Sequence, residues 1–111
     1  MKLSEIVKAL ELTYATPEKI DPDVTDGYTS DLLSDVMGNA REGSILITIQ
    51  AHKNSVAVAS LSGITAILIC NGREIPTDML DAAISEGIGI VCTGDNQYVS
   101  SYKIHRVLAG S

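Results

Sequence analysis

Residues 47–72, ITIQAHKNSVAVASLSGITAILICNG, contain two apolar runs separated by a segment of helical character. The first run begins just before this stretch and extends from Ile45 to Ile49; it is typical of a strand that is buried on both faces of a parallel sheet. It stops at a polar segment in which Asn54 or Ser55 can cap a helix, and Gly63 can end that helix. The second run, TAILIC, ends at Asn71-Gly72. The order strand, helix, strand predicts a right-handed parallel βαβ unit.

The same pattern recurs about twenty residues later. LICNG at 68–72 aligns with IVCTG at 90–94, as apolar, apolar, Cys, polar, Gly. A helix is predicted after each: residues 78–86, capped by Thr77 and burying Leu80, Ala83 and Ile84, and a final helix capped by Asp95 or Asn96. Such repetition is what successive βα units of one parallel sheet produce.

The N-terminal third is less regular. The spacing of apolar residues predicts a helix over 3–12, and short strands are expected near 12–14 and 24–28. A further helix, capped by Ser30, carries Leu32, Leu33, Val36 and Met37 on one face. Five Asp lie between 21 and 35, where a solvated acidic loop or a cation site would fit. We predict a single α/β domain over 1–111, with a mainly parallel sheet of four to five strands flanked by helices.

Composition narrows the function. The chain has 111 residues, a net charge of −6 and 45% hydrophobic residues. An acidic chain without basic clusters is a poor ligand for nucleic acid or an anionic membrane. No signal peptide or membrane span is evident, so we expect a cytoplasmic protein. Cys70 and Cys92 are expected to be reduced, buried thiols, and a metal site is not expected because no CxxC pair is present.

Polar residues follow all three clear strands. Because helices leave a parallel sheet from the carboxyl ends of its strands, these residues should gather on one edge, where ligands of such sheets bind. They can be ordinary caps and turns, or they can form a ligand-binding rim. The candidate ligand-binding residues are Gln50, His52, Asn54, Asn71, Gly72, Thr93, Gly94 and Asp95. The amides suit a polar ligand such as a nucleobase, whereas Asp95 would repel a bare anion unless a cation lay between.

Catalytic signatures are absent. The sequence has no GxSxG, HExxH, GxGxxG or GxxxxGK[ST], so neither a catalytic site nor a cofactor is predicted. His52 or His105 could meet a cysteine only through the fold.

The final helix carries two stripes. Ile104, Val107 and Leu108 form the expected core face. Tyr98, Tyr102 and His105 lie on a different stripe, and tyrosine is enriched at interfaces because it combines area with a hydrogen bond. A homodimer is therefore expected, with these three residues as the candidate interface.

The blocks ITIQAHKNSVAVA and AILICNG…GIGIVCTGDN, within residues 24–108, resemble the DRTGG domain in its small stand-alone bacterial form. The string that names the family is missing, and Cys70-Asn71-Gly72 stands where many members have Thr-Gly-Gly. The resemblance implies an α/β domain related in shape to the N-terminal domains of Mur ligases and HPr kinase, which pairs as a dimer and occurs beside CBS modules in some pyrophosphatases.

Two functions of different classes follow. The first is a non-catalytic regulatory or interaction module that dimerises and senses a small polar or nucleotide-type ligand, with a metabolic or redox enzyme as a possible partner. The alternative is a small enzyme or phosphotransfer protein related to HPr serine kinase, a label often given to stand-alone copies. The missing P-loop argues against kinase activity.

Overall fold

The computed structural model describes residues 1–110, which form five helices and one five-stranded sheet. The helices are α1 (Leu3–Leu10), α2 (Leu33–Asn39), α3 (Lys53–Ser62), α4 (Thr77–Glu86) and α5 (Gln97–Leu108). The strands are β1 (Thr13–Tyr14), β2 (Asp26–Thr29), β3 (Ser44–Thr48), β4 (Ala66–Ile69) and β5 (Gly89–Cys92). The strand order is β1-β5-β4-β3-β2, with β2 to β5 parallel and β1 antiparallel to β5.

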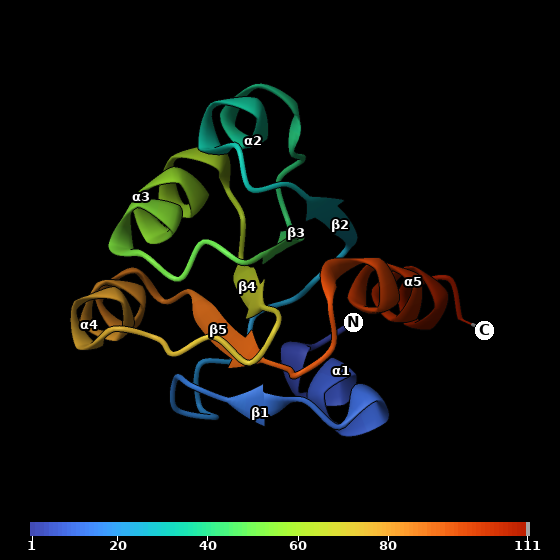
Figure 1. The fold of residues 1–111 in the computed structure, drawn as a ribbon. Coiled ribbons are helices and arrows are strands. Elements are labelled where there is room, and N and C mark those ends of the chain that lie inside the picture. Colours follow the sequence, from blue (N-terminus) through green and yellow to red (C-terminus); the bar gives the residue numbers. More distant parts are fainter. Residues whose placement is uncertain (111) are drawn as a thin grey trace.

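The sheet lies between two layers of helices. Helices α2, α3 and α4 cover one face, and α1 and α5 cover the other (Figure 1). Successive side chains of a strand point to opposite faces, so Ile45 and Ile47 pack toward α1 and α5, whereas Leu46 packs toward the other layer. This double burial explains the continuous apolar runs and confirms the predicted α/β fold class.

The helix starts differ from the prediction in three places. Helix α2 begins after Leu32 and not at Ser30, whose hydroxyl, among residues 1–110, accepts a hydrogen bond only from the N–H of Leu32, at 3.1 Å. The side chain of His52, not Asn54 or Ser55, caps α3: its Nδ1 accepts a hydrogen bond from the N–H of Asn54 at 3.1 Å. Thr77 is the first helical residue of α4, and the capping position is Pro76, which has no side-chain acceptor. By contrast, the Oδ1 of Asn96 accepts from the N–H of Val99, so the predicted cap of α5 is confirmed.

The predicted apolar faces of two helices were partly wrong. Only Val36 is buried in α2, while Leu32, which precedes the helix, and Met37 are exposed. In α4 the buried residues are Met79 and Ala83, and Ile84 is exposed. One residue of α2 and two of α4 are buried, so the predicted stripes of four and three residues overstate what each helix buries.

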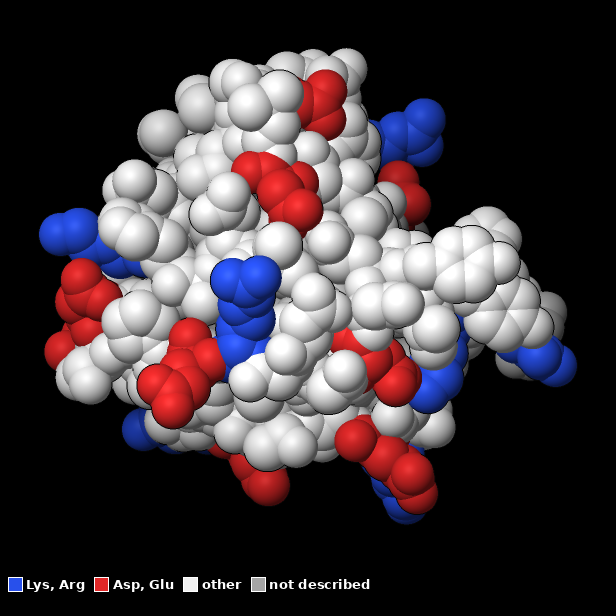
Figure 2. Space-filling view, viewed as in Figure 1, with Lys and Arg blue, Asp and Glu red and all other residues white. Residues whose placement is uncertain are grey.

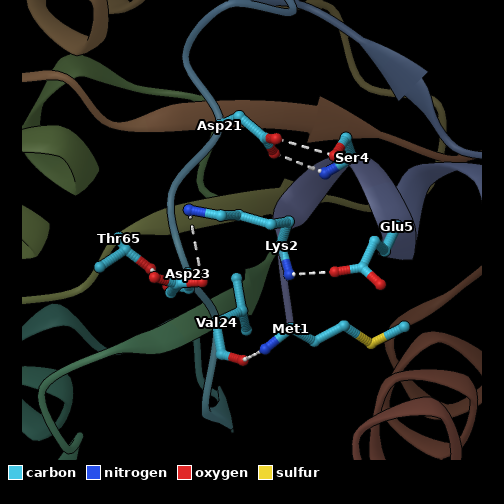
Figure 3. Close-up of polar contacts among 8 residues, drawn as sticks. All are labelled: Met1, Lys2, Ser4, Glu5, Asp21, Asp23, Val24 and Thr65. Carbon is cyan, nitrogen blue, oxygen red and sulfur yellow. Dashed lines mark hydrogen bonds and ion pairs between the residues drawn. The ribbon is translucent and has the colours of Figure 1, made fainter.

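The amino edge of the sheet is closed by the N-terminal residues (Figure 3). Met1 and Val24 exchange two backbone hydrogen bonds, because the α-amino group donates to the carbonyl of Val24 and the N–H of Val24 donates to that of Met1. The backbone N–H and the hydroxyl of Ser4 both donate to the carboxylate of Asp21 at 2.8 Å. Thr65, just before β4, donates to the carbonyl of Asp23. These contacts anchor α1 and leave the opposite edge for the candidate site.

Within residues 1–110, no helix combines the length and the apolar character that crossing a bilayer requires.

Candidate functional site at the carboxyl edge of the sheet

The carboxyl ends of four parallel strands meet at one edge of the sheet. The loops that lead from β3, β4 and β5 into α3, α4 and α5 lie together in the front of Figure 1. The prediction that the polar strand ends share one edge is therefore confirmed. We call the residues that follow these strands, 30–31, 49–52, 70–73 and 93–96, the rim.

Asp31, which follows β2, joins three parts of the rim. Its Oδ1 atom accepts hydrogen bonds from the hydroxyl of Thr48 at 2.8 Å, from the N–H of Ile49 at 3.0 Å and from the side-chain amide of Gln97 at 3.0 Å. The side-chain amide of Gln50 donates to the Asp31 carbonyl at 3.1 Å. The sequence does not indicate this role, because Asp31 is one of five aspartates in a segment for which a solvated loop or a cation site was expected.

The loops after β4 and β5 are hydrogen-bonded to each other. The N–H of Asn71 donates to the carbonyl of Asp95, and the N–H of Gly72 donates to the carbonyl of Thr93, both at 2.9 Å. Asn71 and Gly72 have φ values of 64° and 62°, so the pair forms a left-handed turn that Asn-Gly tolerates well. These two bonds join the loops to each other, and the N–H of Gly72 already has a protein acceptor.

A cavity of about 230 Å³ opens at this pair of loops. It is lined by Thr13, Gly72, Arg73, Cys92, Thr93 and Gly94. Three of the eight candidate residues, Gly72, Thr93 and Gly94, therefore lie around one hollow. Arg73 is not among the predicted site residues, although it directly follows the Asn71-Gly72 turn at the end of a strand.

Charges of both signs surround the rim. Lys103 of α5 pairs with Asp95, with 2.8 Å between Nζ and Oδ2, so the cation required beside Asp95 is supplied by the protein itself. Arg73, which lines the cavity, is exposed. Figure 2 shows acidic and basic side chains interspersed over this face rather than a patch of one sign. The rim can therefore meet a ligand that carries both polar and anionic groups.

The remaining candidates point elsewhere. His52 and Asn54 are exposed at the start of α3, and within residues 1–110 no hydrogen bond connects them to the loops after β4 and β5. Asn54 lines a groove of about 510 Å³ between α3 and α4. The predicted ligand-binding residues thus lie in different places. Gly72, Thr93 and Gly94 line the rim cavity, Gln50 contacts Asp31, and His52 and Asn54 lie at the start of α3.

The two cysteines are poor nucleophiles. Cys70 is fully buried, and burial raises the pKa of its thiol, partly opposed by a hydrogen bond from Sγ to the hydroxyl of Ser100 at 3.4 Å. Cys92 is half-buried and not buried as predicted, because it lies beside the cavity. Its Sγ donates to the carbonyl of Thr13 at 3.5 Å, and partial burial raises the pKa of its thiol. Because the thiolate is the reactive form, both sulfurs are weakly reactive at neutral pH. Among residues 1–110, no group of three His, Cys, Asp or Glu is placed to hold a metal ion.

Comparison with known proteins shows a similar fold but not a family. No family model and no curated protein matches the sequence. The fold, by contrast, is similar to that of a solved structure: the CBS and DRTGG domains of the regulatory region of Clostridium perfringens pyrophosphatase, complexed with the activator diadenosine tetraphosphate. The TM-score is 0.70 at 13% sequence identity, over 92% of this chain and 45% of that chain. The chain thus spans less than half of its neighbour, and the similarity supports a DRTGG-like fold.

Proposed function

We propose that the protein is a non-catalytic regulatory module that works as a cytoplasmic homodimer and binds a small nucleotide-type ligand at the rim. The observation that carries the proposal is the cavity between the loops after β4 and β5, at the edge where four parallel strands end. In open α/β sheets this edge is the usual place for ligands.

The lining of the cavity indicates which part of a ligand it receives. Arg73 offers a guanidinium group, which suits phosphate, and the hydroxyl of Thr93 and the backbone of Gly94 can add polar contacts. Pockets for whole small-molecule ligands are typically ~300–1,000 Å³, so about 230 Å³ accommodates one portion of a ligand, such as a phosphate group. The rest of the ligand would extend over the rim toward Asn71 and Gln50, whose side-chain amides can form hydrogen bonds with a base.

The arrangement of reactive groups favours binding over catalysis. The Nδ1 atom of His52 is occupied as the cap of α3, and neither thiol has a basic residue as a hydrogen-bond partner. A nucleophile needs an adjacent base or a lowered pKa, whereas both cysteines have raised pKa values. The small-enzyme alternative therefore receives no support from the geometry.

The similar pyrophosphatase region supports the class of ligand. That structure was solved with diadenosine tetraphosphate, an activator of that protein. A compound of this kind combines bases with phosphates, which is the mixture of groups that the rim can meet. We extend to this chain the class of nucleotide-type ligand, not that particular compound.

A thermal-shift series tests the proposal. The probes are AMP, ADP, ATP and diadenosine tetraphosphate, each compared with buffer of equal ionic strength. A ligand that binds only the folded state stabilises it by about 2.7 kcal/mol at one hundred times its Kd. We expect at least one nucleotide to raise Tm, and Arg73→Ala to remove the effect.

Lys53→Ala is the matched control, because Lys53 is also an exposed cation after a strand but lies away from the rim cavity. Absence of a shift with all four probes would contradict the proposal. Equal loss in the Arg73 and Lys53 variants would show non-specific attraction of phosphate and would contradict the assigned site.

A further inference from the structure

Helix α5, which packs beside the edge strand β2, carries two exposed tyrosines. Tyr98 is 84% exposed and Tyr102 is 59% exposed, both on α5 one turn apart. Tyrosine is enriched at protein interfaces relative to the rest of the protein surface. His105, which is also exposed, continues the same stripe.

A cavity of about 310 Å³ lies next to this stripe, between α5 and β2. Its lining combines apolar side chains with polar ones: Thr25, Asp26, Gly27, Thr29, Ile47, Ser101, Ile104, His105, Leu108 and Ala109. Gly27 contributes to the hollow because it lacks a side chain, and a Cβ there would stand 3.4 Å from Cγ2 of Ile104. A cavity of about 150 Å³ already accepts a benzene ring, so this one has room for an aromatic side chain.

Strand β2 lies at one edge of the sheet, but its surroundings oppose pairing with a strand of another molecule. Within residues 1–110 it pairs only with β3, and the N–H of Gly27 donates to Oδ1 of its neighbour Asp26 at 2.8 Å. The hydroxyls of Thr29 and Ser101 are 2.6 Å apart and tie the strand to α5. Charged side chains at an edge oppose strand addition. A partner at this surface therefore binds through side chains, and the cavity is the feature that it can fill.

We propose that a second copy of this chain occupies the surface, with the two α5 helices antiparallel about a two-fold axis near Tyr102 and with Tyr98 of each copy in the cavity of the other. The inference rests on the homodimer of the proposed function and assigns its interface. In a two-fold interface residue i meets j and j meets i. With Tyr102 at the axis, Tyr98 faces position 106 of the partner, between His105 and Ala109, which both line the cavity.

The chemistry of the two surfaces is complementary. A buried tyrosine needs a partner for its hydroxyl, and the carboxylate of Asp26 and the imidazole of His105 stand in the cavity lining. Arg106 already holds Tyr102 in place: its Nη1 atom donates to the phenolic oxygen at 2.8 Å, and the guanidinium carbon lies 5.9 Å from the ring centroid. Tyr102 is thus pre-positioned at the axis, which reduces the entropy lost on association.

Disulfide trapping tests the arrangement. Within one helix, positions 98 and 109 are about 16 Å apart at 1.5 Å per residue, far beyond the roughly 4.4–6.8 Å between Cα atoms that a disulfide spans. A cross-link in the double variant Tyr98→Cys/Ala109→Cys must therefore join two copies. We expect covalent dimer in this variant and in Tyr102→Cys, and none in Tyr98→Cys alone or in the wild type, which carries the native Cys70 and Cys92.

Light scattering and sedimentation supply the second readout. We expect the wild type to be a dimer at micromolar concentration and Tyr98→Ala to raise the dimer Kd at least tenfold. Leu61→Ala is the matched control, since Leu61 is 76% exposed on α3 and lies outside this surface, and it should leave Kd unchanged.

The outcomes separate the two claims. A wild-type monomer would overturn both the homodimer and this interface. A dimer that tolerates Tyr98→Ala and gives no 98–109 cross-link would overturn the interface alone. Nucleotide binding at the rim is measured separately and stands or falls by its own thermal shifts.

Discussion

The hydroxyl of Thr48 donates a hydrogen bond to the carboxylate of Asp31 at 2.8 Å, and this contact joins the loop after β2 to the end of β3. Thr48 is fully buried, and the same Asp31 oxygen also binds the side chain of Gln97 at the start of α5. One carboxylate thus holds together segments that lie 17 and 66 residues away in the sequence. The shape of the Asp31 side of the rim depends on this residue.

Asp31→Ala should destabilise the protein by ~1–3 kcal/mol, because it leaves the buried hydroxyl of Thr48 without its acceptor. Thr48→Val removes the hydroxyl as well, so the double variant should cost less than the sum of the two single changes. Urea denaturation of all four proteins gives the coupling energy, expected at about 0.5–3 kcal/mol. Asp23→Ala, which breaks only an exposed ion pair with Lys2, is the control and should cost no more than about 1 kcal/mol. Strict additivity at Asp31 and Thr48 would argue against the network.

The two rim glycines should respond differently to alanine. Both have open space where a Cβ would stand, but only Gly72 has a positive φ. Gly72→Ala should therefore cost ~1–2 kcal/mol, the penalty of placing an L-residue in the left-handed region. Gly94→Ala should stay within about 0.5 kcal/mol of the wild type. Equal free energies of unfolding for the two variants would show that the left-handed turn at Asn71-Gly72 does not form in solution.

Stability should decline at alkaline pH through Cys70. Its pKa is raised by burial, so the folded state keeps the proton at a pH where the unfolded chain, with a thiol pKa of about 8.5, has lost it. The contribution is complete below about pH 8.5 and is lost as pH rises toward the higher folded-state pKa. The free energy of unfolding of Cys70→Ala should therefore fall less steeply above that pH than that of the wild type, which has the same tyrosines. Parallel curves would contradict the assignment.

The protein should neither hydrolyse ATP nor transfer its phosphate. The sequence lacks a P-loop, and the Nδ1 atom of His52 is occupied in capping α3. The measurement is incubation of the purified protein with γ-labelled ATP, with and without HPr. Phosphate release or transfer that disappears in His52→Ala would establish the enzymatic alternative.

The fold could be predicted from the sequence because its central strands are buried on both faces of the sheet. Runs such as ILITI at 45–49 and AILI at 66–69 have no other stable place in a chain of this size, and the glycines after the helices mark their ends. The shared edge of the polar strand ends followed from the parallel order alone. The starts of α3 and α4 were harder to predict. His52 and Pro76 occupy the capping positions, although Asn54, Ser55 and Thr77, which have stronger capping preferences, lie close by in the sequence.

The site was only partly readable because its contacts are long-range. Nothing near Asp31 in the sequence indicates that it binds Thr48 and Gln97, and its neighbours suggested a solvated loop. Similarly, the cavity that contains Arg73 arises from pairing of the loops after β4 and β5, which lie more than twenty residues apart. Local patterns placed the strand ends, whereas the tertiary hydrogen bonds decided which of their residues meet.

The most direct test of nucleotide binding at the rim is an amide chemical-shift titration of ¹⁵N-labelled protein with ADP and with diadenosine tetraphosphate. We predict saturable shifts centred on the backbone amides of Gly72, Arg73, Thr93 and Gly94, with smaller changes at Asn71 and Asp95, and loss of these shifts in Asn71→Ala/Thr93→Ala. Shifts confined to the groove between α3 and α4 or to the cavity beside β2, or no shift at millimolar nucleotide, would contradict the account.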